Sequence, residues 1–257
     1  MNQPYNLYHF LWKTADWLYP PVCAGCGKAN FRFCPDCLAS VNIFKGNRCP
    51  FCGNKISSSQ TICDRCNDKP VYFSTAASWA EYGGVLREAI HALKYKSNIG
   101  LGDYFSRFLI DLLLEKSWNF DLVIPVPLSK ERTIERSYNQ AALLSHPIAL
   151  YFRVGHDTKA LFRIKETGSQ ITRSRIDRDS YLEDAFSGNS AKLKGRNVLL
   201  VDDIITTGST INHCARALLE AGATQVKAIS VAKTLKIRHN KDPMTIPFLD
   251  YPNSNGG

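Results

Sequence analysis

The sequence lacks any apolar run that approaches the roughly 20 residues that a membrane-spanning helix requires. Its N-terminal segment, residues 5–20, is apolar only in patches, has no basic cluster before it and is interrupted by Asp16. These features argue against a cleaved export signal and predict a short amphipathic helix within residues 1–19. We therefore expect a cytoplasmic protein, in a compartment where thiols stay reduced.

Acidic residues are scarce relative to basic ones. The chain has 23 aspartates and glutamates against 32 lysines and arginines, which gives a formal net charge of +9 at pH 7. A surplus of this sign favours anionic partners, and the phosphates of a small substrate or of a nucleic acid would both satisfy it. A generally basic, soluble surface would show the same surplus, so charge alone does not choose a partner.

Cysteine is almost absent outside one segment, because eight of the nine lie between residues 23 and 66. They form four CxxC pairs: Cys23 and Cys26, Cys34 and Cys37, Cys49 and Cys52, and Cys63 and Cys66. Zinc prefers four thiolates in a tetrahedron, so the pairs predict two structural zinc ions in a double zinc-ribbon module over residues 20–70. The simplest arrangement joins the first two pairs at one ion and the last two at the other. A crossed pairing is the alternative, as are redox or disulfide chemistry. Cys214 is expected to serve packing only.

From residue 71 onward, short apolar runs alternate with segments of helical periodicity. The apolar runs, which predict strands, are residues 74–82, 120–127, 198–201 and 225–234. The periodic segments, which predict helices, are residues 83–96, 103–116, 209–223 and a segment from Asn139 that Pro147 should kink or shorten. This alternation predicts an α/β fold over residues 71–235, a mostly parallel sheet flanked by helices. Residues 236–257 show no period and are expected to be a loose tail.

Residues 198–210 combine features that suit an anion. A buried strand ends in Asp202 and Asp203, and a polar turn then leads into a helix. The residues of the turn and the helix start are Thr206, Thr207, Gly208, Ser209 and Thr210. Backbone amides at such a helix start point at one spot, and Gly208 lets the backbone come close to a ligand. The acids would repel a phosphate, so we expect them to accept from sugar hydroxyls. The plain alternative is a connection in which Thr or Ser caps the helix.

This segment resembles the phosphoribosyl diphosphate loop of type I phosphoribosyltransferases, in which two acids meet a TTG[ST]-type turn. The resemblance implies displacement of diphosphate from ribose C1 through a transition state with oxocarbenium character. Asp202 and Asp203 would hold the ribose and stabilise its developing charge, and the amides of residues 206–210 would hold the 5-phosphate. Magnesium would neutralise the leaving diphosphate.

Over residues 20–234 the chain resembles the ComF family of competence-related phosphoribosyltransferase-like proteins. The segment IPVPLSKER resembles the family's PVPL segment and is similar to a diphosphate-binding loop. Pro125, Val126 and Lys130 would then lie at the diphosphate, where the loop offers amides and a cation. The alternative is a strand whose prolines only build a turn.

The segment RSYNQA resembles the family's RGxNQA motif, with Ser137 where the family has glycine. Arg136, Asn139 and Gln140 would line or brace the site. If the glycine serves a special backbone angle, Ser137 must adopt that angle as well. In the alternative reading, Asn139 simply caps the helix that follows.

Residues 159–178 are rich in basic side chains and resemble a further segment of the family. The resemblance places Arg163, Gln170 and Arg178 at the site, on a basic hood that closes over a phosphorylated ligand and excludes water. Arg163 and Arg178 would act with the two acids in catalysis. The alternative is a solvated charged loop.

The resemblance as a whole implies a phosphoribosyl (pentosyl) transferase that binds phosphoribosyl diphosphate and acts beside the DNA-uptake proteins of natural transformation. The alternative is a non-catalytic factor that grips single-stranded DNA. Basic and aromatic side chains in the cysteine segment could serve that grip, although the aromatics could equally be its core. These side chains are Arg32, Lys45, Arg48, Lys55, Arg65, Phe31, Phe33, Phe44 and Phe51.

Overall fold

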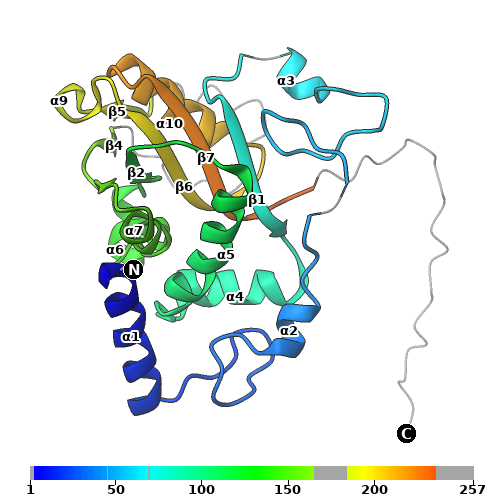
Figure 1. The fold of residues 1–257 in the computed structure, drawn as a ribbon, viewed down its shortest axis with the longest axis vertical. Coiled ribbons are helices and arrows are strands. Elements are labelled where there is room, and N and C mark those ends of the chain that lie inside the picture. Colours follow the sequence, from blue (N-terminus) through cyan, green and yellow to red (C-terminus); the bar gives the residue numbers. More distant parts are fainter. Residues whose placement is uncertain (1–2, 45, 69, 165–183, 236–257) are drawn as a thin grey trace, which may run out of the picture.

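A five-stranded parallel sheet forms the centre of the protein (Figure 1). The computed structural model describes residues 3–44, 46–68, 70–164 and 184–235. The strand order is β1-β7-β6-β2-β3, and each neighbouring pair is parallel. The strands are β1 (Thr75–Glu81), β2 (Leu122–Pro125), β3 (Gly155–His156), β6 (Asn197–Ile205) and β7 (Gln225–Lys233). The predicted α/β architecture with a mostly parallel sheet is confirmed.

Alternate side chains of the central strands enter two cores, one on each face of the sheet. Leu199 and Val201 belong to one core, and Val198 and Leu200 belong to the other. This division explains why the strand segments are apolar throughout and do not alternate with polar residues. The helices α4 (Gly84–Tyr95), α5 (Leu101–Lys116) and α7 (Gln140–Phe152) close the first core, and α10 (Ser209–Glu220) closes the second. The N-terminal helix α1 (Gln3–Leu18) packs on α7.

One predicted strand end is wrong. The strand predicted to end in the two acids continues to Ile205, because Ile204 and Ile205 still pair with β7. Of the two effects predicted for Pro147, a kink or a shortened helix, the shortening is not found, since α7 runs on to Phe152 with Pro147 buried inside it.

Short elements complete the described fold. A two-stranded antiparallel ribbon joins β4 (Leu161–Arg163) to β5 (Phe186–Gly188), and α10 packs against it. The remaining helices are α2 (Pro35–Ala39), α3 (Asp64–Asp68), α6 (Lys130–Arg136) and α9 (Ser190–Leu193). Each of these segments is too short for its apolar residues to establish a period.

The two cysteine groups pack on opposite faces of the sheet. Cys23, Cys34 and Cys37 belong to the core closed by α4 and α5, whereas Cys49, Cys52 and Cys63 belong to the core beneath α10. In Figure 1, α2, which carries Cys37 of the first group, and α3, which carries Cys66 of the second, accordingly lie far apart.

The chain between the two groups runs along the outer edge of β1. Ile43 forms a bridge with Ala80, and the Glu81 amide donates to Asn42 O at 2.8 Å. The cysteine segment therefore also covers a sheet edge that would otherwise present unpaired backbone groups.

Ser137, where the resembled motif has glycine, adopts the left-handed conformation, with φ of 62° at the C-terminus of α6. A Cβ atom in this region costs roughly 1–2 kcal/mol. Ser137→Gly should therefore stabilise the fold by about 1 kcal/mol, which corresponds to a melting temperature about 2–4 °C higher. Thermal unfolding checks this result.

Ser40→Gly is the matched control, because Ser40 also ends a helix but has φ of −83° and donates to Cys37 O. It should lower the melting temperature. An unchanged or lower melting temperature for Ser137→Gly would contradict the assignment of strain.

Candidate functional site

The turn between β6 and α10 presents backbone amides at a helix start. Gly208 is the N-cap and has φ of 76°, and the first intrahelical bond runs from the Asn212 amide to Gly208 O at 2.9 Å. The amides before Asn212 therefore have no partner within the helix. Thr206 is exposed, and Thr207 Oγ1 accepts from the Ser209 amide at 3.3 Å. The alternative in which Thr or Ser is the N-cap is wrong, since glycine occupies that position.

Asp202 and Asp203 have different surroundings, although the sequence predicts the same task for both. Asp203 is 3% exposed; its Oδ1 accepts from Gln140 Nε2 at 3.1 Å, and its Oδ2 lies 2.5 Å from Lys94 Nζ. Asp202 is partly exposed and accepts the Asp203 backbone amide at 2.9 Å. Of the two carboxylates, only that of Asp202 combines solvent exposure with the absence of an ion pair among the described residues.

Ionisation of the Asp202 carboxyl is unfavourable in the folded chain. Burial raises the pKa of this carboxyl well above its usual range, the neighbouring Asp203 raises it further, and Lys94 opposes the shift. Lys94 thus compensates one of two adjacent negative charges directly and the other only from a distance. A ligand that donates hydrogen bonds to Asp202 would relieve this repulsion.

A chain of hydrogen bonds fixes the inner acid. Gln140, which donates to Asp203, accepts from Arg136 Nη1 at 3.0 Å, and Arg136 Nη2 donates to the Tyr95 hydroxyl at 2.9 Å. The guanidinium also stacks on the Tyr95 ring, 4.6 Å from its centroid. Arg136 and Gln140 are buried, so in this structure they brace the acid and do not line an open surface.

Asn139 does two things at once. Its Oδ1 accepts from the Ala141 amide at 2.9 Å and caps α7, as the simple alternative predicts. Its Nδ2 donates to Val126 O at 2.9 Å and so ties the helix to the loop after β2.

The loop after β2 opens at the same sheet edge as the turn after β6, because the two strands are parallel neighbours. Pro125 pairs with Val201, and the Val126 amide donates to Val201 O at 2.9 Å. Lys130 is exposed and begins α6 after the N-cap Ser129. Residues 126–130 thus lie beside the strand that carries the two acids.

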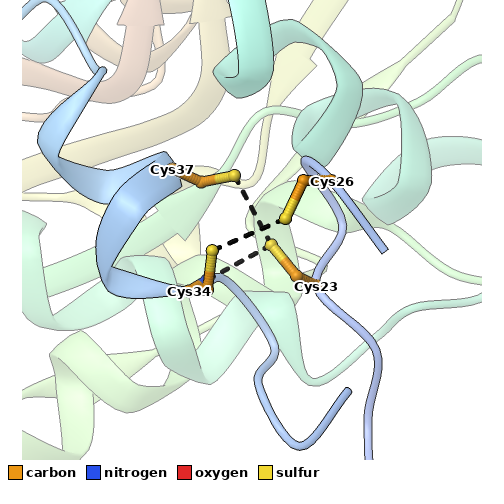
Figure 2. A group of neighbouring side chains, drawn as sticks. All are labelled: Cys23, Cys26, Cys34 and Cys37. Atoms are coloured by element: carbon orange, nitrogen blue, oxygen red, sulfur yellow. Dashed lines mark hydrogen bonds between the residues drawn. The ribbon is translucent and has the colours of Figure 1, made fainter. Parts of the chain in front are cut away.

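The eight clustered cysteines form two groups of four. In each group the sulfur atoms lie within 4.8 Å of one another: Cys23, Cys26, Cys34 and Cys37 in one, and Cys49, Cys52, Cys63 and Cys66 in the other. Figure 2 shows the first group converging from two CxxC turns. The sequential pairing is confirmed and the crossed pairing is wrong. None of the nine cysteines forms a disulfide, and Cys214 is fully buried in the core, as expected for packing.

The sulfur geometry fits zinc. A tetrahedral zinc centre with bonds of about 2.3 Å separates its sulfurs by about 3.8 Å. Cys23 and Cys37 are 3.7 Å apart, Cys26 and Cys34 are 3.6 Å apart, and Cys52 and Cys63 are 3.4 Å apart. Burial opposes the ionisation of Cys23, but backbone amides, among them that of Cys34, donate to its sulfur and lower its pKa to about 6. A thiolate is therefore favoured at this position before any metal binds.

Comparison with known proteins now decides the family. The family described as "Double zinc ribbon domain" matches residues 14–67, and the family described as "Phosphoribosyl transferase domain" matches residues 155–247. "DNA utilization protein YhgH" of Escherichia coli K12 is 32% identical over 211 residues, covering 80% of this chain and 92% of that protein. "Competence protein F" of Haemophilus influenzae is 29% identical over 225 residues, covering 79% of this chain and 97% of that protein. "Competence protein ComFC" of Bacillus subtilis is 28% identical, covering 82% of this chain and 86% of that protein.

This chain belongs to the ComF family.

Of the site residues predicted for a hood, only Arg163 lies in the described part of the chain. It ends β4, and its guanidinium lies 5.5 Å from the centroid of the Phe186 ring in β5. Burial and Asp202 raise the pKa of the Cys214 thiol, whereas Arg163 lowers it. The predicted site residues Gln170 and Arg178 lie outside the described residues.

Two functional candidates are not assigned to the site by the sequence reasoning. Lys94, with Lys96, resembles a basic patch of the family, but a lysine at a helix C-terminus is equally explained by the helix dipole, and only the fold brings Lys94 to Asp203. Lys233 ends β7 and is 1% exposed, and among the described residues its Nζ has no hydrogen-bond partner. Burial lowers the pKa of Lys233, and the thiolates of Cys52, Cys63 and Cys66 oppose that shift. A buried ammonium group beside the second cysteine group fits the net negative charge of a four-thiolate zinc centre.

The two acids should have opposite effects on stability. Asp202→Asn keeps the acceptor for the Asp203 amide and removes a repelling charge, so it should raise the melting temperature at neutral pH. Because the folded-state pKa of Asp202 is raised, the gain should be absent below about pH 3.9, should grow as the pH rises from there to the raised pKa, and should be constant above it. Asp203→Asn leaves Lys94 without its partner and should cost about 1.5–3 kcal/mol.

Thermal unfolding across a range of pH values measures both effects. Destabilisation by Asp202→Asn at neutral pH would refute the assignment of repulsion.

Metal analysis of the purified protein should find two zinc ions per chain, one for each four-cysteine group. A thiol-modifying reagent should release both ions and should unfold the cysteine units, which owe part of their stability to the metal. Protein that is folded and free of metal would contradict the zinc assignment.

Proposed function

We propose that this chain binds phosphoribosyl diphosphate together with magnesium and transfers the phosphoribosyl group to an acceptor. The observation that carries the proposal is the turn at residues 206–208, where Gly208 starts α10 and the amides of the first helical turn have no partner within the helix, beside a partly exposed acid. Family membership supports it, because the phosphoribosyl transferase domain matches this part of the chain.

Each part of the ligand has a proposed partner. The 5-phosphate would accept from the amides and hydroxyls of Thr206, Thr207, Gly208, Ser209 and Thr210, where the helix dipole favours negative charge. Asp202 would accept from the ribose hydroxyls. The loop at Pro125, Val126 and Lys130 would hold the diphosphate, which is shared with magnesium.

Catalysis would consist mostly of positioning and charge stabilisation. As the bond from ribose C1 to diphosphate breaks, the sugar gains positive charge, and the carboxylate of Asp202 would stabilise it. Asp203 would act through Asp202 and Lys94 by keeping the local charge balance, since its own oxygens already have partners. The proposed hood, with Arg163, Gln170 and Arg178, would exclude water during the transfer.

Calorimetry with phosphoribosyl diphosphate and magnesium tests this proposal. The wild-type chain should bind, and the double variant Asp202→Asn/Asp203→Asn should lose binding. Asp36→Asn is the control, since Asp36 pairs with Lys28 on the first cysteine unit and has an exposed side chain. Equal affinities of the wild-type chain and the double variant would overturn the proposal. Release of diphosphate only in the presence of a particular acceptor would then identify the transfer reaction.

A second candidate is the binding of single-stranded DNA, in a role beside DNA-uptake proteins in the cytoplasm. The names of the relatives, which mention DNA utilization and competence, favour it. So does a groove of about 660 Å³ beside β1, where Arg48 stacks on Phe44 at 3.8 Å and Trp118 lines the wall. Asp111 and Glu115 line the same groove and would repel a phosphate backbone, so this candidate ranks second. Affinity for single strands that falls steeply with salt would favour it.

The aromatic side chains of the cysteine units divide between the two interpretations. Phe33 is 2% exposed and contacts Phe105, so it is core. Phe31 is at the surface, with Lys28 Nζ 5.7 Å from the centroid of its ring.

A further inference from the structure

The second cysteine unit, which holds Cys49, Cys52, Cys63 and Cys66, places a guanidinium group directly against the turn that starts α10. A Cβ atom added to Gly208 would lie 3.0 Å from Arg65 Nη1 and 3.8 Å from Arg65 Cζ. Arg65 belongs to α3, between Cys63 and Cys66, and is partly buried. A residue of one cysteine group thus lies at the proposed phosphate site on the α/β fold.

Several contacts hold the second unit in this position. The Tyr72 amide donates to Asn212 Oδ1 at 2.8 Å, and Asn212 Nδ2 donates to Pro70 O at 3.0 Å. Asn212 lies in the first turn of α10, so the chain that leaves α3 is fastened to the helix start itself. Thr75 Oγ1 also donates to Pro50 O at 2.7 Å and ties the other half of the unit to β1. The cysteine unit that carries Arg65 is therefore held to the α/β fold at two places.

Arg65 brings a positive charge to the turn that follows the two acids. Within the described part of the chain, no carboxylate forms an ion pair with Arg65. Arg65 therefore adds a positive charge at a place where backbone amides already favour an anion.

We propose that Arg65 is a phosphate-contacting residue of the ligand site, and that it donates to the 5-phosphate held by the turn. A guanidinium group presents two parallel N–H donors, which match two oxygens of a phosphate. The inference deepens the proposed function and rests on it. Its consequence is that the second zinc centre, which fixes α3, takes part in ligand binding, whereas the first centre on the opposite face does not.

Calorimetry on the full chain tests the inference with two ligands, magnesium phosphoribosyl diphosphate and ribose 5-phosphate. Arg65→Gln should weaken the binding of both by about tenfold or more, since a charge-assisted pair is lost and the lost pair lies at the phosphate that both ligands share. Arg65→Lys keeps the positive charge but lacks the paired donors. Its affinities for both ligands should therefore lie between those of Arg65→Gln and those of the wild-type chain. Lys55→Gln is the matched control, because it removes one exposed positive charge from the same unit and should leave both affinities unchanged.

The outcomes separate this inference from the proposed function. If the wild-type chain binds neither ligand, both the proposed function and the inference about Arg65 are overturned. If the wild-type chain binds and Arg65→Gln binds equally well, the inference alone is overturned, as it is if only phosphoribosyl diphosphate binding weakens. Zinc content is measured for each variant. If Arg65→Gln loses zinc, the test uses Arg65→Lys that retains its full zinc content. Weaker binding of both ligands by Arg65→Lys then supports the phosphate contact, and wild-type affinity overturns it.

Discussion

Two neighbouring carboxylates share one cation at the carboxyl edge of the sheet, and the rest of the site is arranged around that imbalance. Lys94 lies against Asp203, which Gln140 also holds, so the inner acid is compensated. Asp202 is left partly exposed, with a pKa raised by burial and by its neighbour. Such repulsion persists only where the surrounding structure enforces it, and it is relieved by a ligand rich in hydrogen-bond donors. The hydrogen-bond chain from Tyr95 through the buried Arg136 and Gln140 supplies this constraint.

The sheet brings the remaining parts together. Because β2 and β6 are parallel neighbours, the loops that follow them open at one edge, and Asn139 ties the first of these loops to α7. The two cysteine groups are too small to fold around cores of their own, and each completes a core of the sheet on a different face. The second group thereby lies beside the helix start that the proposed ligand would use.

Burial patterns explain how much of this fold is predictable from the sequence. Segments such as β6 and β7 are apolar over several residues, and α4 and α5 repeat their apolar residues at helical spacing, so their types follow from local pattern alone. The short elements β3, β4, β5 and α6 show no periodicity, so the local sequence pattern does not predict them. The four CxxC pairs predict the metal groups because the ligand spacing is local.

The geometry of the candidate site is harder to predict from the sequence. The turn and the two acids are contiguous in sequence, and therefore visible, but the difference between the acids depends on Lys94 and Gln140, which come from distant elements. Likewise Ser137 reveals its positive φ, and Lys233 its burial beside thiolates, only in the folded chain.

The most direct test of the account is a titration of ¹⁵N-labelled protein with phosphoribosyl diphosphate and magnesium, followed by NMR. The amide resonances of Gly208, Ser209 and Thr210 should shift most, and ribose 5-phosphate alone should shift the same amides, since the phosphate is proposed to bind there. Binding that leaves these amides unchanged while others move would contradict the account.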